Sequence, residues 1–86
     1  MKNSVTQETI DQLLAGSEIH VETVFDKATI VAVKLPSGFV LTESSGAVDS
    51  ANYDKEIGKS ICLDKIKDKL WELEGYRLQT RLQEDK

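Results

Sequence analysis

The stretch that most constrains the fold begins at Asn52 and reads NYDKEIGKSICLDKIKDKLWELEGY. The strong helix formers Glu, Lys, Leu and Ile dominate it, and either Asp49 or Asn52 can accept the free amide hydrogens of a first helical turn. Gly75 stands where a left-handed residue would end the helix. The sequence therefore predicts one long helix over residues 52–74, followed by a tail over residues 76–86.

The apolar residues of this predicted helix fall on two sides. At 100° per residue, one broad face collects Cys62, Leu63, Ile66, Leu70 and Leu73. A second group lies nearer the opposite side and consists of Ile57, Ile61 and Trp71. A helix that is apolar on two sides needs two surfaces to pack against. We expect one to be the protein's own sheet, and the other to be a second subunit, the N-terminal helix or the folded-back tail.

Length and composition place the chain among small globular proteins. Its 86 residues suffice for one domain over residues 1–86, whose folding would remove roughly 60 to 65% of the extended chain's surface from water. Charged residues make up 30% and apolar residues 40% of the chain. The single cysteine, Cys62, excludes an intramolecular disulfide. No run is apolar enough for a membrane span or a secretory signal, so we expect a soluble cytoplasmic protein with no membrane partner.

The charge pattern argues against a nucleic-acid partner. The formal net charge is −4, and Lys and Arg residues are spread among acidic residues instead of forming a basic patch. Binding to a phosphate backbone needs such a patch. A negative charge of this size is ordinary for solubility, which we favour over mimicry of DNA.

The N-terminal part predicts a short helix over residues 4–15. Ser4 and Gln7 have the spacing of a capping box, and Gly16 follows the last turn. The apolar face of this helix is small and consists of Ile10, Leu13 and Leu14. A short helix with so small a face is marginal alone, so it should dock on a larger element.

Residues 18–43 predict three strands. Residues 19–26 alternate as in a half-buried strand, with Phe25 on its more apolar side. Residues 28–35 are apolar on both faces, which is typical of a central strand that is covered on both sides.

A turn at residues 36–38 then joins the second strand to a third one over residues 39–43, and residues 44–46 should end the pairing. Proline fixes φ in this turn, and Gly38 is free to take a positive φ. The fold class is therefore α+β, with a short N-terminal helix, a three-stranded antiparallel β-meander and a long C-terminal helix.

Two runs carry a family resemblance: GFVLTESSGAVDSANYDKEIGKSIC, which begins at Gly38, and KLWELEGYRLQTRL, which begins at Lys69. They resemble the phage gene-product-49-like family of small proteins encoded by tailed bacteriophages and prophages, over about residues 24–82. The chain departs from the family pattern at Ser50, where proline is common, and at residues 59–62, where an Arg-Lys-Ile-Ala type of run is common. The resemblance implies a phage or prophage origin and action inside a bacterial cell. It implies no catalytic residue.

The residue types that commonly carry chemistry are few. His20 is the only histidine and stands on the polar side of a predicted strand, and Cys62 falls on the broad apolar face of the long helix. Three carboxylates recur every four residues on that helix, at Asp64, Asp68 and Glu72, but lysines interleave them as on a solvated face. We therefore predict no catalytic residue, no cofactor and no metal site.

Two aromatic residues are candidates for contact with a ligand or partner. Large rings with a polar tip are enriched at the centres of interfaces, and Trp71 and Tyr76 are of this kind. Trp71 lies off the main apolar face, as expected of a residue that meets a partner. The alternative is that it covers the protein's own core.

Three cations are candidates for binding a small anionic ligand. Arg77 and Arg81 are one helical turn apart if the chain stays helical after Gly75, and we group Lys34 with them. The alternative is that these cations form surface ion pairs, with Glu72, Glu74 or Glu84 as partners.

Taken together, these features favour a binding protein over an enzyme. We expect a non-enzymatic protein of the host cytoplasm, a homo-oligomer of two or more subunits, that inhibits a host defence process. It would do so by binding a host protein or by sequestering a small signal molecule. The alternatives are a structural or assembly protein of the virion and a small metal-dependent hydrolase.

Overall fold

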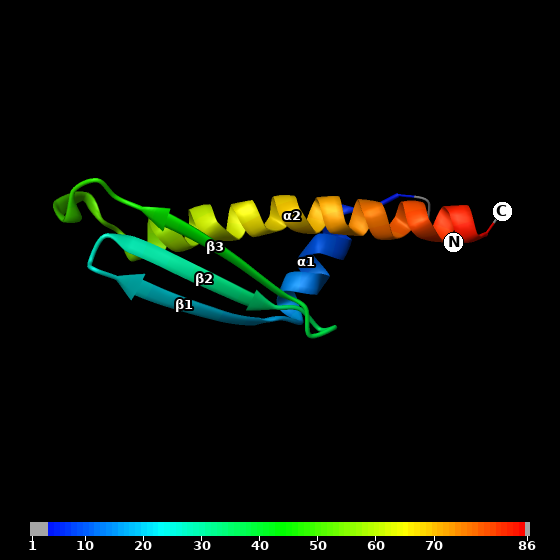
Figure 1. The fold of residues 1–86 in the computed structure, drawn as a ribbon, viewed down its shortest axis with the longest axis horizontal. Coiled ribbons are helices and arrows are strands. Elements are labelled where there is room, and N and C mark those ends of the chain that lie inside the picture. The colour runs from blue at the N-terminus through cyan, green and yellow to red at the C-terminus, as the bar shows by residue number, and fades with distance from the viewer. Residues whose placement is uncertain (1–3, 86) are drawn as a thin grey trace.

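The structure is a computed structural model that describes residues 4–85. Its elements in chain order are α1 (Gln7–Ala15), β1 (Glu18–Val24), β2 (Ala28–Lys34), β3 (Val40–Gly46), a 3-10 turn (Ser50–Asn52) and α2 (Lys55–Glu84). The three strands form one sheet, and α2 runs along it and past its end (Figure 1). This arrangement confirms the predicted α+β fold class.

The sheet is antiparallel with the order β1-β2-β3, so β2 is central as predicted. Its residues Thr29, Val31 and Val33 are buried on the face turned toward α2, called here the inner face. The outer face carries Ile30, which is 37% exposed, and Lys34. The expectation that β2 is covered on both sides is wrong for a single chain, because both helices contribute to the core on the inner face.

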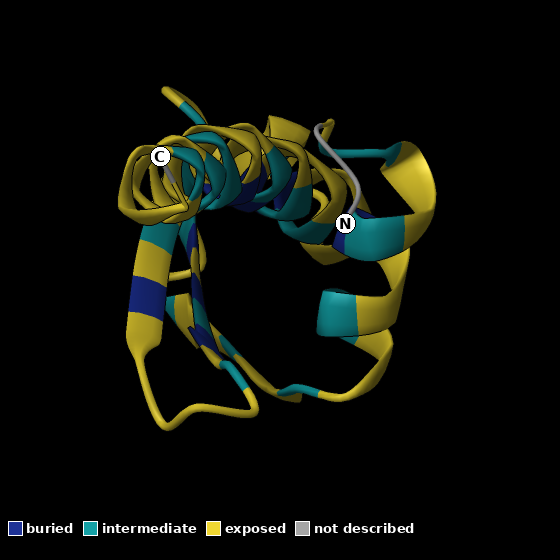
Figure 2. Ribbon diagram, turned by 90° about the vertical axis from the view of Figure 1, so that its right-hand side faces the viewer, coloured by how far each residue is buried: buried dark blue, intermediate teal, exposed yellow. Residues whose placement is uncertain are grey.

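The core lies between the sheet and the helices. Its buried apolar residues are Ile10 from α1, Val31, Val33 and Leu41 from the sheet, and Cys62, Ile66 and Leu70 from α2. Ile57 and Ile61 remain exposed on another side of α2, as the two-sided pattern predicted. Figure 2 shows that the buried parts of α2 face the sheet.

At its N-terminal end α2 approaches the sheet very closely. A Cβ atom added to Gly58 would lie 2.9 Å from the Cβ of Thr29 and closer still to its Oγ1. The Tyr53 hydroxyl hydrogen-bonds to the Oγ1 atoms of Thr29 and Thr23 at 2.8 and 2.9 Å. The glycine therefore sets the distance between helix and sheet, and the tyrosine satisfies a hydroxyl that this close contact buries.

We divide α2 into a packed half, residues 55–73, and a projecting half, residues 74–84. All four buried residues of the helix, Gly58, Cys62, Ile66 and Leu70, lie in the packed half. A 30-residue helix is about 45 Å long, whereas a strand of seven residues spans about 23 Å. The helix therefore outruns the sheet, and the molecule measures 56 × 20 × 17 Å (Figure 1).

The predicted end of the long helix at Gly75 is wrong. The helix continues to Glu84, and Asp85 is its C-cap. A glycine inside a helix costs only about 1 kcal/mol, and a single one does not outweigh good helix formers on both sides. The predicted tail is therefore helical through Glu84. The helix begins at Lys55, because Asp54 is the residue whose carboxylate accepts from the first-turn amides of Glu56 and Ile57, at 2.9 and 3.3 Å.

Two other boundaries differ from the predictions, and one turn conformation agrees with them. In α1 the N-cap is Thr6, not Ser4, because its Oγ1 accepts a hydrogen bond from the Thr9 amide at 3.3 Å. Residues 44–46 do not end the pairing of β3, since each has a partner in the first half of β2. Gly38 takes the predicted positive φ, at 95°.

The first hairpin turns earlier than the alternation predicted. β1 ends at Val24, and Phe25 and Asp26 form the turn with φ of 56° and 53°. Positive φ at both central residues is the geometry of a type I′ turn, whose twist suits antiparallel strands, so the turn overrides the strand propensity of Phe25. Its ring is 90% exposed instead of lying on the inner face.

Candidate ligand groove

An open groove of about 570 Å³ lies where α1, the turn after β2 and the projecting half of α2 meet. Its lining residues are Ser4, Val5, Thr9, Gln12 and Leu13 from the N-terminal part, Pro36 from the turn, and Glu74, Arg77, Leu78 and Arg81 from α2. A volume of this size is within the range of small-molecule sites. The groove thus brings two of the predicted site residues, Arg77 and Arg81, together.

The helix itself brings Arg77 and Arg81 into the groove. Residues four apart lie on one side of a helix, with their Cβ atoms about 6 Å apart. This spacing applies because α2 continues through Gly75, so the condition attached to the prediction is met. Both arginines line the groove.

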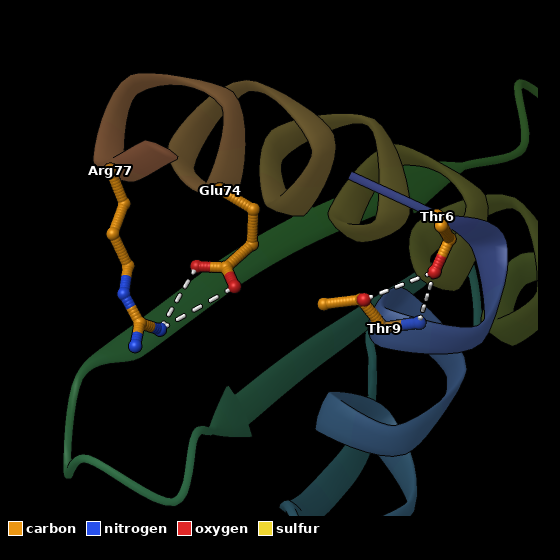
Figure 3. A network of polar contacts seen from close by, with 4 residues as sticks. All are labelled: Thr6, Thr9, Glu74 and Arg77. Carbon is orange, nitrogen blue, oxygen red and sulfur yellow. Dashed lines mark hydrogen bonds and ion pairs between the residues drawn. The ribbon is translucent and has the colours of Figure 1, made fainter. Parts of the chain in front are cut away.

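One acidic residue partly offsets these two cations. Arg77 Nη1 donates to both carboxylate oxygens of Glu74, at 3.5 Å each (Figure 3). These bonds are long for a charge-assisted pair, which is usually 2.7–2.9 Å, and the arginine side chain is largely exposed. Within residues 4–85, Arg81 has no ion pair. Two guanidinium groups and one carboxylate give the groove a local charge of +1.

The opposite wall of the groove supplies hydroxyl and amide groups. Ser4, Thr9 and Gln12 line it. Figure 3 shows Thr9 on α1, with its Oγ1 atom 3.1 Å from that of the N-cap residue Thr6, while Glu74 and Arg77 project from α2. Val5, Leu13 and Leu78 add apolar surface. The groove can therefore hold an anionic group on α2 and an apolar or hydroxylated body against α1.

The third predicted cation, Lys34, lies elsewhere. It ends β2 on the outer face of the sheet, where it is paired in register with Glu18 and Val40, and it does not line the groove. The sequence predicted the arginines but not the α1 wall. Thr9 and Gln12 carry no sequence signal of a site, because only tertiary packing brings them into the same groove as the arginines.

The two predicted aromatic contacts lie outside this groove. Tyr76 is 74% exposed and lines a second hollow of about 350 Å³ with Phe39, Leu41 and Leu73. Trp71 is exposed on the side of α2 that turns away from the sheet. Sequence reasoning missed Phe39, which the predicted strand had placed within β3 and the structure leaves exposed just before it.

The other residues singled out for chemistry are placed as follows. His20 is exposed on the outer face of the sheet, and Cys62 is buried with its Sγ 3.7 Å from the Thr29 carbonyl oxygen. Burial raises the pKa of the Cys62 thiol. Within residues 4–85, no group of three His, Cys, Asp or Glu side chains is placed to hold a metal ion, and no helix has the length and apolarity to cross a membrane.

Fold and site together define a small two-layer α+β protein with a cationic groove beside a projecting helix. The chain belongs to the Phage protein (N4 Gp49/phage Sf6 gene 66) family, whose profile matches residues 5–82. This match confirms the resemblance drawn from the GFVLTESSGAVD and LEGY runs. No curated protein and no solved structure matches the chain significantly.

Proposed function

We propose that this phage protein is a non-enzymatic, oligomeric binding protein that takes a small anionic ligand into its groove in the host cytoplasm. By sequestering a signal molecule of this kind, it would inhibit a host defence process. The observation that carries the proposal is the pair Arg77 and Arg81, which line one groove from adjacent helical turns.

The chemistry of the groove fits a ligand with one anionic and one less polar part. A guanidinium offers a planar set of donors that matches phosphate or carboxylate oxygens. Arg77 Nη1 is 3.5 Å from the Glu74 carboxylate, which is a long contact. A bound phosphate that took the place of this carboxylate as the partner of Arg77 would make shorter and stronger contacts. The apolar side chains and the Thr9 hydroxyl across the groove would hold the body of the ligand.

A role in binding, as opposed to catalysis, is supported by where the reactive residue types lie. His20 is on the outer face of the sheet and Cys62 is in the core, so neither lines the groove. The groove hydroxyls of Ser4 and Thr9 have no imidazole or thiolate beside them among the lining residues.

Isothermal titration calorimetry with inorganic pyrophosphate and with ADP at low salt tests this proposal. We expect both to bind, and ADP to bind more tightly because it also covers the apolar wall. The double variant Arg77→Ala/Arg81→Ala should lose at least about tenfold in affinity, since each charge-assisted contact contributes about 1.5–3 kcal/mol.

The matched control is Lys34→Ala, which removes a cation outside the groove and should leave the affinity unchanged. Equal losses of affinity in the double variant and in Lys34→Ala would show that binding depends on the net charge of the protein and not on the groove. Absence of binding by the wild type would leave the anion-binding proposal without support.

A second candidate is the binding of a host protein, which the hollow around Phe39, Leu73 and Tyr76 favours. These apolar side chains are exposed side by side between the start of β3 and α2. Native mass spectrometry of the protein purified from a bacterial host separates the two candidates. Extra mass of nucleotide size supports ligand uptake, a stoichiometric host protein supports inhibition through this hollow, and recovery with particles would support a virion role.

A further inference from the structure

The rest of the chain contacts the two edges of the sheet differently. At the β3 edge, Lys65 Nζ donates to the Ser44 carbonyl at 3.0 Å and Lys69 Nζ donates to the Thr42 carbonyl at 3.3 Å. Lys69 also forms an ion pair with Glu43 at 2.6 Å. Lysines over an edge strand occupy its free carbonyls and oppose pairing with another strand. The β3 edge is therefore closed.

The β1 edge is open. Within residues 4–85, the backbone from Glu18 to Thr23 receives no hydrogen bond from any element other than β2. In Figure 1 nothing lies beyond β1 on the side away from β2. A regular, unbulged strand of seven residues with free amides and carbonyls is a template for another strand.

We infer that a second copy of the chain pairs with β1, antiparallel and about a two-fold axis at Val21. Val21 then faces the Val21 of the partner subunit, and Ile19 faces the partner's Thr23. On the outer face, His20 lies opposite the partner's Glu22, and Glu22 lies opposite the partner's His20. The product is one six-stranded sheet with both α2 helices on its inner face, an isologous arrangement.

Charge complementarity favours this occupant and this register. An imidazole N–H donates to a carboxylate whether the ring is neutral or charged, so each dimer gains two such contacts. The other charged groups near His20 on the outer face are Glu18 and Lys34, which are paired with each other in register. Both helices and their charges are on the inner face.

Other registers that keep the faces matched are worse. Sliding the strands by two residues in one direction places Glu22 opposite the partner's Glu22. Sliding them in the other direction places Glu18 opposite the partner's Glu22 and His20 opposite the partner's His20. Like charges directly opposite each other destabilise a strand pair. The selected register also pairs all seven residues of β1, and it gives Ile19, which is 43% exposed, a neighbour on the inner face.

Sedimentation velocity of the full chain at micromolar concentration tests the inference. The wild type should sediment at twice the 9.6 kDa chain mass. His20→Glu should raise the dimer dissociation constant by about tenfold or more, because each of two carboxylates then faces the partner's Glu22. The swap His20→Glu/Glu22→His restores both pairs and should restore the dimer. Thr42→Glu, on the same row of the outer face but at the closed edge, is the matched control and should have no effect.

A disulfide trap tests the register. Only a residue on the axis faces itself, with Cα atoms about 4.5–5.5 Å apart, which a disulfide can bridge. Val21→Cys should therefore form covalent dimers under mild oxidation. Ile19→Cys should not, since its two copies would be roughly 14 Å apart along the strands. The native Cys62 is buried and does not interfere.

The inference is overturned if the wild type is a monomer. It is also overturned if the wild type is a dimer that His20→Glu leaves intact and that Val21→Cys does not cross-link. The inference depends on the proposed function in one respect only: it names β1 as the surface through which the proposed oligomer forms. Pyrophosphate titrations of the same samples distinguish failure of the dimer inference from failure of the proposed function. Loss of binding in the Arg77→Ala/Arg81→Ala dimer bears on the groove alone, and loss of the dimer in His20→Glu with binding intact bears on β1 alone.

Discussion

The packed half and the projecting half of α2 carry one glycine each, and the two glycines have opposite meanings. Gly58 lies against Thr29, where no Cβ fits, whereas a Cβ at Gly75 would have no other atom within 4 Å. The packed half is thus shaped by the sheet beneath it. The projecting half is shaped by helix propensity, and its free side chains are available for a ligand.

The largest effect is expected from Gly58→Ala in the packed half. The added methyl group collides with Thr29 and forces α2 away from β2, which should cost about 2–3 kcal/mol of the free energy of unfolding. Urea denaturation followed by circular dichroism measures this loss. An unchanged midpoint would mean that helix and sheet can separate at this point without cost. Adding Thr29→Ala should recover part of the loss, because it removes the nearest atom, Oγ1.

Gly75→Ala in the projecting half should change the free energy of unfolding by a smaller amount and in the opposite direction, so this variant should be more stable than the wild type. Alanine is favoured over glycine in a helix interior by about 1 kcal/mol, and the structure leaves open space for the methyl group. The same urea titration should show a higher midpoint, and hydrogen exchange should show greater protection after residue 75. Destabilisation by this change would contradict a continuous helix through the glycine.

The smallest effect concerns pH and the contact between the packed half and β3. The hydrogen bond from Lys69, helped by the charges of Lys69 and Lys65, holds the pKa of Glu43 below its ordinary value of 4.5. A lowered folded-state pKa contributes stability that is complete above 4.5 and is lost as the pH falls through the lowered value. Wild-type thermal midpoints should therefore exceed those of Glu43→Gln at pH 7 and converge with them in acid.

The control for this experiment is Glu72→Gln, an exposed acid of α2 with no ion pair within residues 4–85. Its difference from the wild type should not change with pH in the same way. A constant gap between Glu43→Gln and wild type at all pH values would show that the ion pair does not stabilise the fold.

Residue patterns were enough to predict the elements and many of the core positions. Cys62, Ile66 and Leu70 face the sheet as their 100° spacing predicted, and β2 is central as its apolar run predicted. Boundaries were less predictable, because they depend on individual backbone contacts. Phe25 left the strand for a turn, and Asp54 instead of Asp49 or Asn52 capped α2.

The candidate site was predictable only on one side. Arg77 and Arg81 could be paired from the sequence, because a helix places residues four apart on one face whatever else the chain does. Lys34 was grouped with them from its charge alone, and the topology placed it on the outer face of the sheet.

The sequence by itself determined the family, through the runs that resemble it, and local periodicity and composition determined the α+β class and the two-sided character of the long helix. Only the tertiary structure decided that Gly58 cannot carry a side chain and that Thr9 lines the same groove as the arginines. It also decided that lysines close one sheet edge and leave the other open. These features depend on distances between segments far apart in the chain, which no local pattern encodes.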